Sequence, residues 1–369
     1  MGLTGQITLL AVAAGLGGAG TMGARALRPG RRLDRRTGEI GVLTAAGISG
    51  AGLLAFLGTG RVNGFGVIHL VYLVAVVTVP LLGLTLLVLA LAHRRPGVVA
   101  LSVAALLPAP VGAWATHVAP YRLRVDRADL LLEGPTPNTP VRLGIISDLQ
   151  TDHVGRHEQE AVDRLLALHP DVILVAGDLF QGSFDAYQRT QRPMQELLGR
   201  LEAPGGVFFV RGDVDPLTGP IAVLDGTDIT LLDDDVATTE VGNRRLHIGG
   251  TMLDWQTPAA RRVYRELEAV PDDDIAILLA HRPDVVLDLP VESRVDLTVA
   301  GHTHGGQIAL PIVGPLVTMS NVPRSVAGGG LHEVAGHPIY VATGIGLERL
   351  QAPQVRFLTR PSVTLLTLR

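Results

Sequence analysis

The stretch Gly301-His302-Thr303-His304-Gly305-Gly306-Gln307 does most to decide how this chain folds. It directly follows Asp296-Leu-Thr-Val-Ala-Gly301, an apolar run of the kind found in buried strands. On a helix the two histidines would diverge, but the flanking glycines permit a tight turn in which both imidazoles face one cavity. The stretch therefore predicts a strand that ends in a pair of candidate metal ligands.

Four earlier strand-like runs end in the same way, each in a side chain that can bind a metal. The runs are 141–147 before Asp148, 171–177 before Asp178, 206–212 before Asp213, and 274–280 before His281. In layered α/β sheets, ligands bind in the crevice outside the carboxyl ends of the strands. We therefore expect an α/β domain in which these side chains converge, with crossover helices near 158–169 and 185–201.

The residue types at these strand ends predict a site for divalent cations. Carboxylates and imidazoles together suit Mn²⁺, Fe²⁺, Zn²⁺ or Mg²⁺. The chain has no cysteine, which excludes disulfides, thiolate ligands and a cysteine nucleophile. It also has no GxxxxGK and no GxSxG motif, so P-loop and serine-hydrolase chemistry have no support.

Taken in order, these blocks resemble the calcineurin-like metallophosphoesterases. The blocks are Ser147-Asp148-Leu149-Gln150, Gly177-Asp178-Leu179, Gly212-Asp213-Val214-Asp215, Leu279-Ala280-His281 and the stretch 301–307. The resemblance covers 141–369, and Val355-Arg-Phe-Leu-Thr-Arg-Pro361 is similar to the end of the bacterial membrane-associated branch. It implies an α/β fold of four layers, in which two packed mixed sheets are flanked by helices, with a two-metal centre across the strand ends.

The resemblance also implies a role for each ligand. Asp178 would bridge two divalent ions, and Asp148 and His304 would bind the first of them. His281 and His302 would bind the second. Such a pair of ions holds a phosphoryl group and activates water, which implies a metal-dependent phosphoric ester hydrolase.

The chain departs from the family pattern in two blocks. Gln150 stands where the first block normally has histidine, so either Gln150 binds the metal directly or His153 or His157 replaces it. In the third block, Asp213 stands where an amide is usual and Val214 where histidine is usual. Because valine cannot transfer a proton, fast phosphomonoester hydrolysis is not expected.

Both departures leave an oxygen donor where a metal ligand is expected. An additional carboxylate at Asp213 favours hard ions, so we expect Mn²⁺ or Mg²⁺, with Fe²⁺ or Zn²⁺ as alternatives. Asp215 would either hold a water or act as a catalytic acid, the latter if the neighbouring charge of Asp213 raises its pKa. Arg324 would bind a substrate phosphate, since a guanidinium matches phosphate geometry, although a surface arginine is an open alternative.

The first third of the chain has a different character. The whole sequence has a mean hydropathy of +0.33 with 18% charged residues, and residues 1–120 hold most of the apolar excess. A membrane-spanning helix needs about 20 apolar residues. We expect a helical transmembrane anchor of about four spans, near 3–22, 40–57, 65–91 and 98–117. The first run is alternatively a signal peptide, but its basic cluster follows the apolar stretch.

The arginines predict how this anchor is oriented. Six arginines lie within 25–36 and two more are Arg94 and Arg95, whereas the loop between the second and third spans has only Arg61. By the positive-inside rule the two arginine-rich loops are cytoplasmic. After a linker at 121–140, the metallophosphoesterase domain at 141–369 is then extracytoplasmic in a multi-pass protein of the cell membrane.

The leading hypothesis is a membrane-anchored phosphoesterase that hydrolyses phosphodiester or pyrophosphate bonds of a phosphorylated small molecule or lipid-linked substrate. The alternative is a weakly catalytic protein that binds or senses phosphate ligands with metal, which the loss of histidine at Val214 favours. A transporter is disfavoured because the spans contain no acidic residue. The net charge of −4 also gives no support to a nucleic-acid partner.

Overall fold

A computed structural model describes residues 63–132, 139–217, 219 and 221–369. These residues form two compact units, which are treated separately. A helical unit ends at Val118 and includes Arg349–Gln354, and an α/β unit comprises Ala119–Glu348 and Val355–Arg369. The predicted spans 3–22 and 40–57 and the arginine-rich loop between them lie outside the described residues.

The helical unit contains two helical stretches that are long and apolar enough to cross a membrane, Gly64–Ala92 and Pro96–Tyr121. The first comprises α3 (Gly64–Leu73), η1 (Val74–Thr78) and α4 (Val79–Ala92). The second comprises α5 (Pro96–Leu106), α6 (Pro108–His117) and η2 (Ala119–Tyr121), the last of which already belongs to the α/β unit. Their positions agree with the spans expected at 65–91 and 98–117, and the described residues do not test a bundle of four.

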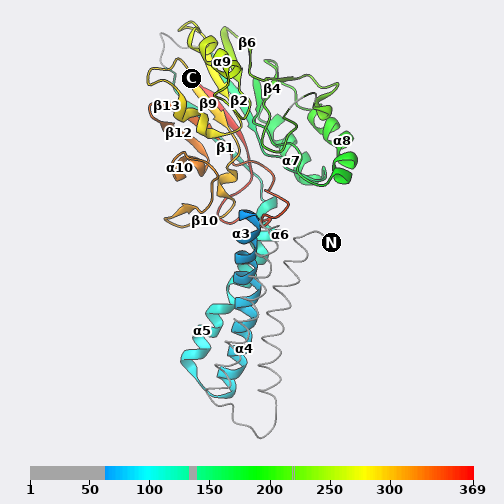
Figure 1. Ribbon diagram of the computed structural model, residues 1–369, viewed down its shortest axis with the longest axis vertical. Helices are drawn as coiled ribbons and strands as arrows, with labels where there is room; N and C mark the ends of the chain where they lie inside the picture. Colours follow the sequence, from blue (N-terminus) through cyan, green and yellow to red (C-terminus); the bar gives the residue numbers. More distant parts are fainter. Residues whose placement is uncertain (1–62, 133–138, 218, 220) are drawn as a thin grey trace. The chain divides into compact units, whose positions relative to one another are not determined.

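The α/β unit contains two mixed six-stranded sheets (Figure 1). The first has the order β1 (Arg124–Leu130), β14 (Ser362–Leu368), β2 (Val141–Ile146), β3 (Val172–Val175), β4 (Val207–Phe209) and β5 (Ile229–Leu231). The second has the order β12 (Gly330–Val334), β13 (His337–Val341), β9 (Leu297–Ala300), β8 (Ile275–Leu279), β7 (Arg244–Gly250) and β6 (Asp235–Val241). A small hairpin pairs β10 (Ala309–Leu310) with β11 (Gly314–Pro315).

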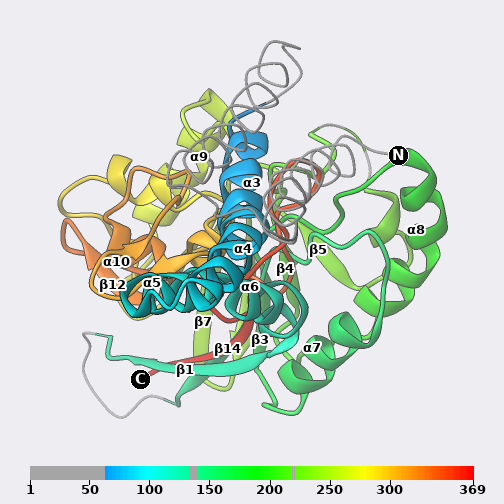
Figure 2. The ribbon, with the colours of Figure 1, turned by 90° about the horizontal axis from the view of Figure 1, so that it is seen from below.

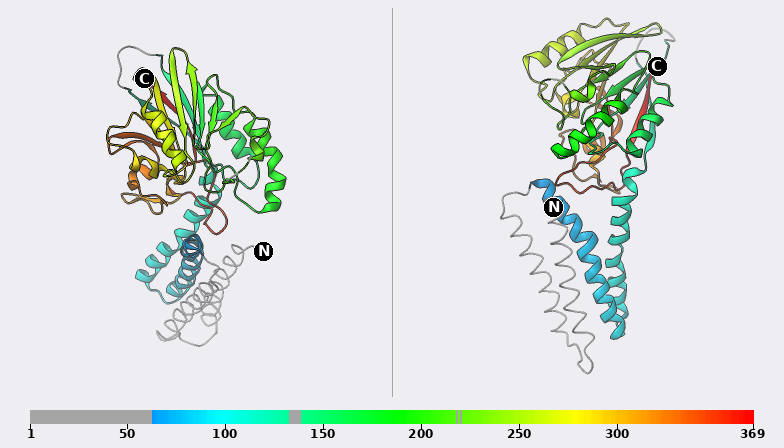
Figure 3. Two further views of the ribbon diagram at one scale, coloured as in Figure 1. Left: turned by 45° about the horizontal axis from the view of Figure 1, so that its top comes forward. Right: turned by 90° about the vertical axis from the view of Figure 1, so that its right-hand side faces the viewer.

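Helices cover the outer faces of both sheets, which gives four layers. Alternation along the strands sends Leu143 and Leu174 into the core between the sheets, and Ile173 into a second core under the helices. That second core packs against α7 (Arg156–Leu166) and α8 (Phe184–Leu198), while α9 (Pro258–Glu268) and α10 (Arg324–Ala327) cover the other sheet. Figures 2 and 3 show these helices on opposite sides of the strands.

The segment expected as a linker, 121–140, contains a strand of the first sheet. Strand β1 pairs in parallel with β14, from Arg124 opposite Ser362 to Leu130 opposite Leu368. Four of its seven residues are charged, which conceals the apolar alternation of a strand, but an edge strand tolerates such residues. The α/β unit therefore begins before Val141, at Ala119.

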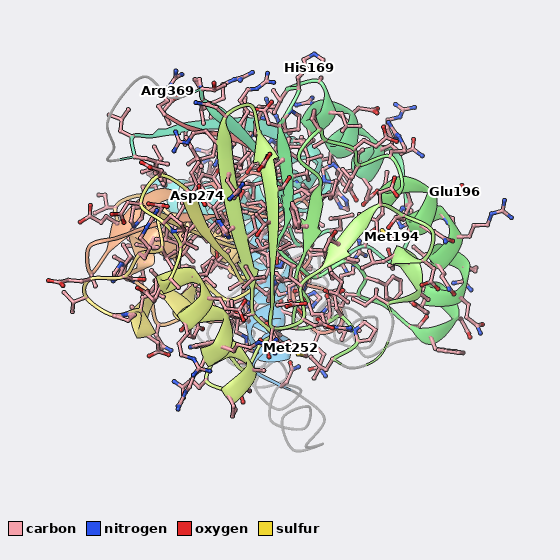
Figure 4. The ribbon with its side chains drawn as sticks, turned by 90° about the horizontal axis from the view of Figure 1, so that it is seen from above. His169, Met194, Glu196, Met252, Asp274 and Arg369 are labelled. Atoms are coloured by element: carbon pink, nitrogen blue, oxygen red, sulfur yellow. The ribbon has the colours of Figure 1, made fainter. Side chains whose placement is uncertain are left out.

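The parallel strands of both sheets end at the same side of the unit. Strands β2, β3 and β4 run parallel in the first sheet, and β8, β9 and β13 run parallel in the second. Asp274 precedes β8 and Met252 follows β7, and Figure 4 shows them at opposite ends of these strands. The predicted ligands follow the carboxyl ends, so they lie at the Met252 end.

Candidate metal centre

Tight left-handed turns aim the predicted ligands across the ends of the strands. Asp148, Asp178, His302 and His304 have φ angles of 48°, 60°, 72° and 50°. A residue other than glycine adopts this region at a cost of roughly 1–3 kcal/mol, and such strain persists where the surrounding structure enforces it. Its recurrence in four residues at three strand ends, those of β2, β3 and β9, indicates that the positions of these side chains matter more than local backbone energy.

One group of ligands joins the two sheets. Atoms of Asp213, His281 and His302 lie within 4.8 Å of one another. His302 Nδ1 is 2.8 Å from Asp213 Oδ2, and His281 Nε2 is 3.5 Å from the same oxygen. The two rings meet edge to face with centroids 5.2 Å apart. This group therefore combines the ends of β4, β8 and β9.

The adjacent group contains the buried carboxylates. Asp148, Asp178 and His281 also offer atoms within 4.8 Å of one another. His281 Nε2 is 3.3 Å from Asp178 Oδ2, so the histidine faces both groups. His304 Nε2 lies 3.6 Å from Asp148 Oδ1. The structure thus brings together Asp148, Asp178, Asp213, His281, His302 and His304.

Two of the histidines are oriented as metal ligands usually are. His281 Nδ1 is 2.7 Å from Ala176 O, and His302 Nε2 is 3.0 Å from Met319 O. If each nitrogen donates to its carbonyl, the other ring nitrogen is left as an acceptor that faces the carboxylates. Such backbone partners fix the tautomer of metal-binding histidines.

Burial of polar atoms tests whether a cation fits. The Nε2 atoms of His281 and His304 are buried without a hydrogen bond, although each faces a carboxylate. Burial raises the pKa of Asp148 to about 6, and the charge of Asp178 adds to this effect. Crowded buried carboxylates and unused imidazole nitrogens are satisfied together by divalent cations. The residues present therefore fit the expected metals.

Comparisons with known proteins agree with this geometry. Residues 141–306 match the family model described as calcineurin-like phosphoesterase. An uncharacterized metallophosphoesterase, YkuE, from Bacillus subtilis is 31% identical over 54% of this chain and 68% of its own length. Phosphodiesterase YaeI from Escherichia coli is 31% identical over 54% of this chain and 70% of its own length.

This chain belongs to the calcineurin-like phosphoesterase family. A transmembrane protein with metallophosphoesterase domain from Bos taurus is 26% identical over 47% of this chain and 42% of its own length. The chain spans 50% of the length of a further relative, from Caenorhabditis elegans.

Gln150 occupies the first departure from the phosphoesterase pattern, and the structure places it differently from a direct ligand. Its Nε2 donates to Asp178 Oδ2 at 2.9 Å and to Glu348 Oε2 at 3.3 Å. An amide nitrogen has no lone pair for a metal, so this orientation makes Gln150 a hydrogen-bond donor to Asp178, the carboxylate expected to bridge the two ions. Gln181 Nε2 holds the other oxygen of Glu348 at 2.7 Å.

Neither histidine proposed as a substitute reaches the metal centre. His153 is largely exposed and its Nδ1 lies 2.9 Å from Asp152 Oδ1. His157 Nε2 lies 2.8 Å from Ile345 O, and its ring packs against Tyr121. Both side chains instead make contacts near the start of α7.

Asp215 is not placed to act as the acid we expected. Its Oδ2 accepts hydrogen bonds from the backbone N–H groups of Asp178 and Gly212, both at 2.8 Å, and its Oδ1 accepts from Leu179 at 3.0 Å. Burial and the charge of Asp178 raise the pKa of Asp215, but the backbone already uses both of its oxygens. The carboxylate instead joins the turns that carry the candidate ligands Asp178 and Asp213.

Two arginines that the sequence did not single out contact the candidate ligands. Arg282, directly after His281, forms an ion pair with Asp213. Arg356 is fully buried and donates to the carbonyls of His304 at 2.7 Å and Gly346 at 2.6 Å, among others. Its guanidinium joins the loops after β9 and β13. Arg324, in contrast, lies exposed at the start of α10, and its phosphate contact stays a prediction.

Proposed function

We propose that this chain is a membrane-associated metal-dependent phosphodiesterase. The chain belongs to the calcineurin-like phosphoesterase family. The observation that best supports metal binding is that the Nε2 atoms of His281 and His304 are buried, face carboxylates and have no hydrogen-bond partner. Two divalent cations, Mn²⁺ or Mg²⁺ in our proposal, would supply Lewis acidity that polarises a phosphoryl oxygen and activates water.

The chain's own residues support a diester or pyrophosphate rather than a monoester. Val214 offers only its backbone N–H, which donates to Asp178 Oδ1 at 2.9 Å, so no proton reaches a leaving group from this position. The leaving group of an activated diester departs without a proton from a general acid. The name of YaeI, a phosphodiesterase, points to the same class of bond.

Membrane association rests on the two long apolar helices and on the transmembrane relative from Bos taurus. Tethering raises the local concentration of the catalytic unit at a surface. We propose on this basis that the substrate is a phosphorylated compound of the membrane or its vicinity, with the α/β unit on the extracytoplasmic side.

The test is metal content and hydrolysis by the purified full-length protein. We expect about two divalent ions per chain and Mn²⁺-dependent cleavage of an aryl phosphodiester. Asp178→Asn and His302→Ala should abolish both, whereas His153→Ala, outside the centre, should change neither. No bound metal, or full activity in Asp178→Asn, would contradict the proposal.

A second candidate, a metal-dependent sensor of phosphate ligands, is favoured only by the valine at 214. Single-turnover measurements distinguish the two functions. An enzyme converts a stoichiometric amount of substrate, whereas a sensor binds the substrate with metal and releases it intact.

A further inference from the structure

The segment 308–323 is unusual for the surface of an α/β unit because it contains no charged residue. It includes the β10–β11 hairpin, and Figure 1 shows β10 outside both large sheets. Its exposed large apolar side chains are Leu310, Ile312, Val313, Leu316, Val317 and Met319. Single exposed apolar residues are ordinary, but a contiguous group of them marks an interaction surface.

Hydrogen bonds anchor both ends of this segment to the α/β unit. The backbone that carries the exposed apolar side chains is therefore held in place. At one end, Ala309 N donates to Phe357 O at 2.9 Å, and Leu316 N donates to Ile308 O at 3.0 Å. At the other end, Asp284 Oδ1 accepts hydrogen bonds from the backbone N–H and the side-chain amide of Asn321, both at 2.8 Å.

The conformation at the tip of the hairpin has a free-energy cost when the α/β unit is considered alone. Ile312 is completely exposed and has a φ of 71°, a region that β-branched residues rarely adopt. An exposed isoleucine in this conformation gains no burial and incurs backbone strain. Folding stability therefore does not account for an isoleucine at this position, whereas a contact made outside the unit does.

The base of the hairpin adjoins the metal centre. Met319 O lies 3.0 Å from Nε2 of His302, one of the candidate ligands. The apolar segment is thus connected to the candidate metal centre both by this contact and by the chain itself, which runs from His304 directly into Ile308. A molecule that touches both would be polar and phosphorylated at one end and apolar at the other.

We propose that segment 308–319 is a membrane contact that enters the lipid interface and presents phosphorylated lipids to the metal centre. The proposal rests on the membrane association proposed above. It assigns a bilayer as the occupant because the chain itself supplies apolar helices, and the second ends at Tyr121, just before β1 begins at Arg124. An uncharged apolar tip is suited to the boundary between headgroups and acyl chains.

Because the chain has no cysteine, single-cysteine labelling tests this contact directly. An environment-sensitive fluorophore is attached at Ile312→Cys or at Val291→Cys, a control apolar site that is 88% exposed. The full-length protein is reconstituted into phosphatidylcholine–phosphatidylglycerol vesicles with or without brominated lipid. We expect brominated lipid to quench the label at 312 and not at 291. Equal quenching at both sites would overturn the proposal. A label at 312 whose emission is blue-shifted but is not quenched by brominated lipid would also overturn it, because this result would indicate contact with a second protein copy.

Hydrolysis gives a second measurement. Ile312→Asp should lower cleavage of a vesicle-embedded phosphodiester lipid by about tenfold, because a charge resists entry into the interface. It should leave cleavage of a soluble aryl phosphodiester unchanged, which also shows that the variant folds. Val291→Asp should affect neither. Equal loss on both substrates contradicts the membrane contact. If the wild type cleaves neither substrate, the proposed function fails, and the quenching result still decides the role of the hairpin.

Discussion

Asp213 is the candidate ligand at which this site differs most in charge from the family pattern, which has an amide there. Its carboxylate lies between His302 and Arg282, with Nδ1 of His302 at 2.8 Å. Burial opposes ionisation of Asp213, but His281, His302 and Arg282 outweigh it and hold its pKa well below the usual range. Asp213 is therefore ionised, and Arg282 would compete with a cation for its oxygens.

This competition predicts opposite effects for two substitutions. Asp213→Asn should weaken Mn²⁺ binding by about ten- to a hundredfold, because a carboxylate becomes a neutral amide. Arg282→Gln should strengthen Mn²⁺ binding, because the competing charge is lost. Titration calorimetry on the full-length protein measures both, with the exposed Arg192→Gln as control. Unchanged affinity in Asp213→Asn would exclude Asp213 as a ligand.

Asp148 makes metal binding depend on pH. Its pKa is raised from 3.8 to about 6 in the folded protein, so between these values the folded metal-free state holds more protons than the unfolded state. Its contribution to the stability of the metal-free protein therefore falls as pH rises through this window. A cation requires the deprotonated carboxylate and so binds more strongly above about pH 6.

We accordingly expect Mn²⁺ to raise the unfolding temperature more at about pH 7.5 than at about pH 5. Scanning calorimetry with and without Mn²⁺ measures the difference. Asp148→Asn should remove most of the Mn²⁺ effect at both values. A Mn²⁺ effect that is the same at both pH values in the wild type would contradict the assignment.

At the scale of elements, the turn after β4 depends on close backbone approach. A Cβ atom at Gly212 would lie 2.1 Å from Asp178 Oδ1, which is too close for any side chain. The backbone N–H of Gly212 also donates to Asp215 at 2.8 Å. Any other residue must move either the turn or the carboxylate of Asp178.

Gly212→Ala should therefore abolish Mn²⁺ binding while the two sheets remain folded. Circular dichroism together with metal analysis measures the two effects separately. Gly155→Ala is a suitable control, because a Cβ there meets its nearest atom at an ordinary 3.4 Å. Metal binding by Gly212→Ala at the wild-type level would show that the turn adapts.

At the scale of the whole molecule, the turn between the two apolar helices bears on the predicted orientation of the chain in a membrane. Arg94 and Arg95 lie between the end of α4 at Ala92 and the start of α5 at Pro96. If both helices span the membrane, this turn is cytoplasmic by the positive-inside rule. The chain that follows Tyr121 then lies on the extracytoplasmic side.

A reporter fused after Arg369 tests this orientation. Alkaline phosphatase, which is active outside the cytoplasm, should be active there, and green fluorescent protein should be dark. Replacing Arg94 and Arg95 with glutamine should reduce the bias, since the described helices would then lose their basic turn. A fluorescent fusion in the wild type would place the α/β unit in the cytoplasm.

The sequence alone determined five of the strands, the metal-capable side chains at their ends and the positions of the two described apolar helices. These features depend on local patterns, such as a buried run that ends in Asp148 or His281 or a long uncharged stretch. Only the tertiary structure showed that Gln150 donates to Asp178, that both oxygens of Asp215 accept from the backbone, and that Arg282 and Arg356 contact the candidate ligands. It also revealed β1 within the expected linker. These contacts join residues far apart along the chain, and a hydrogen bond depends on direction and distance in space, which a local pattern does not specify.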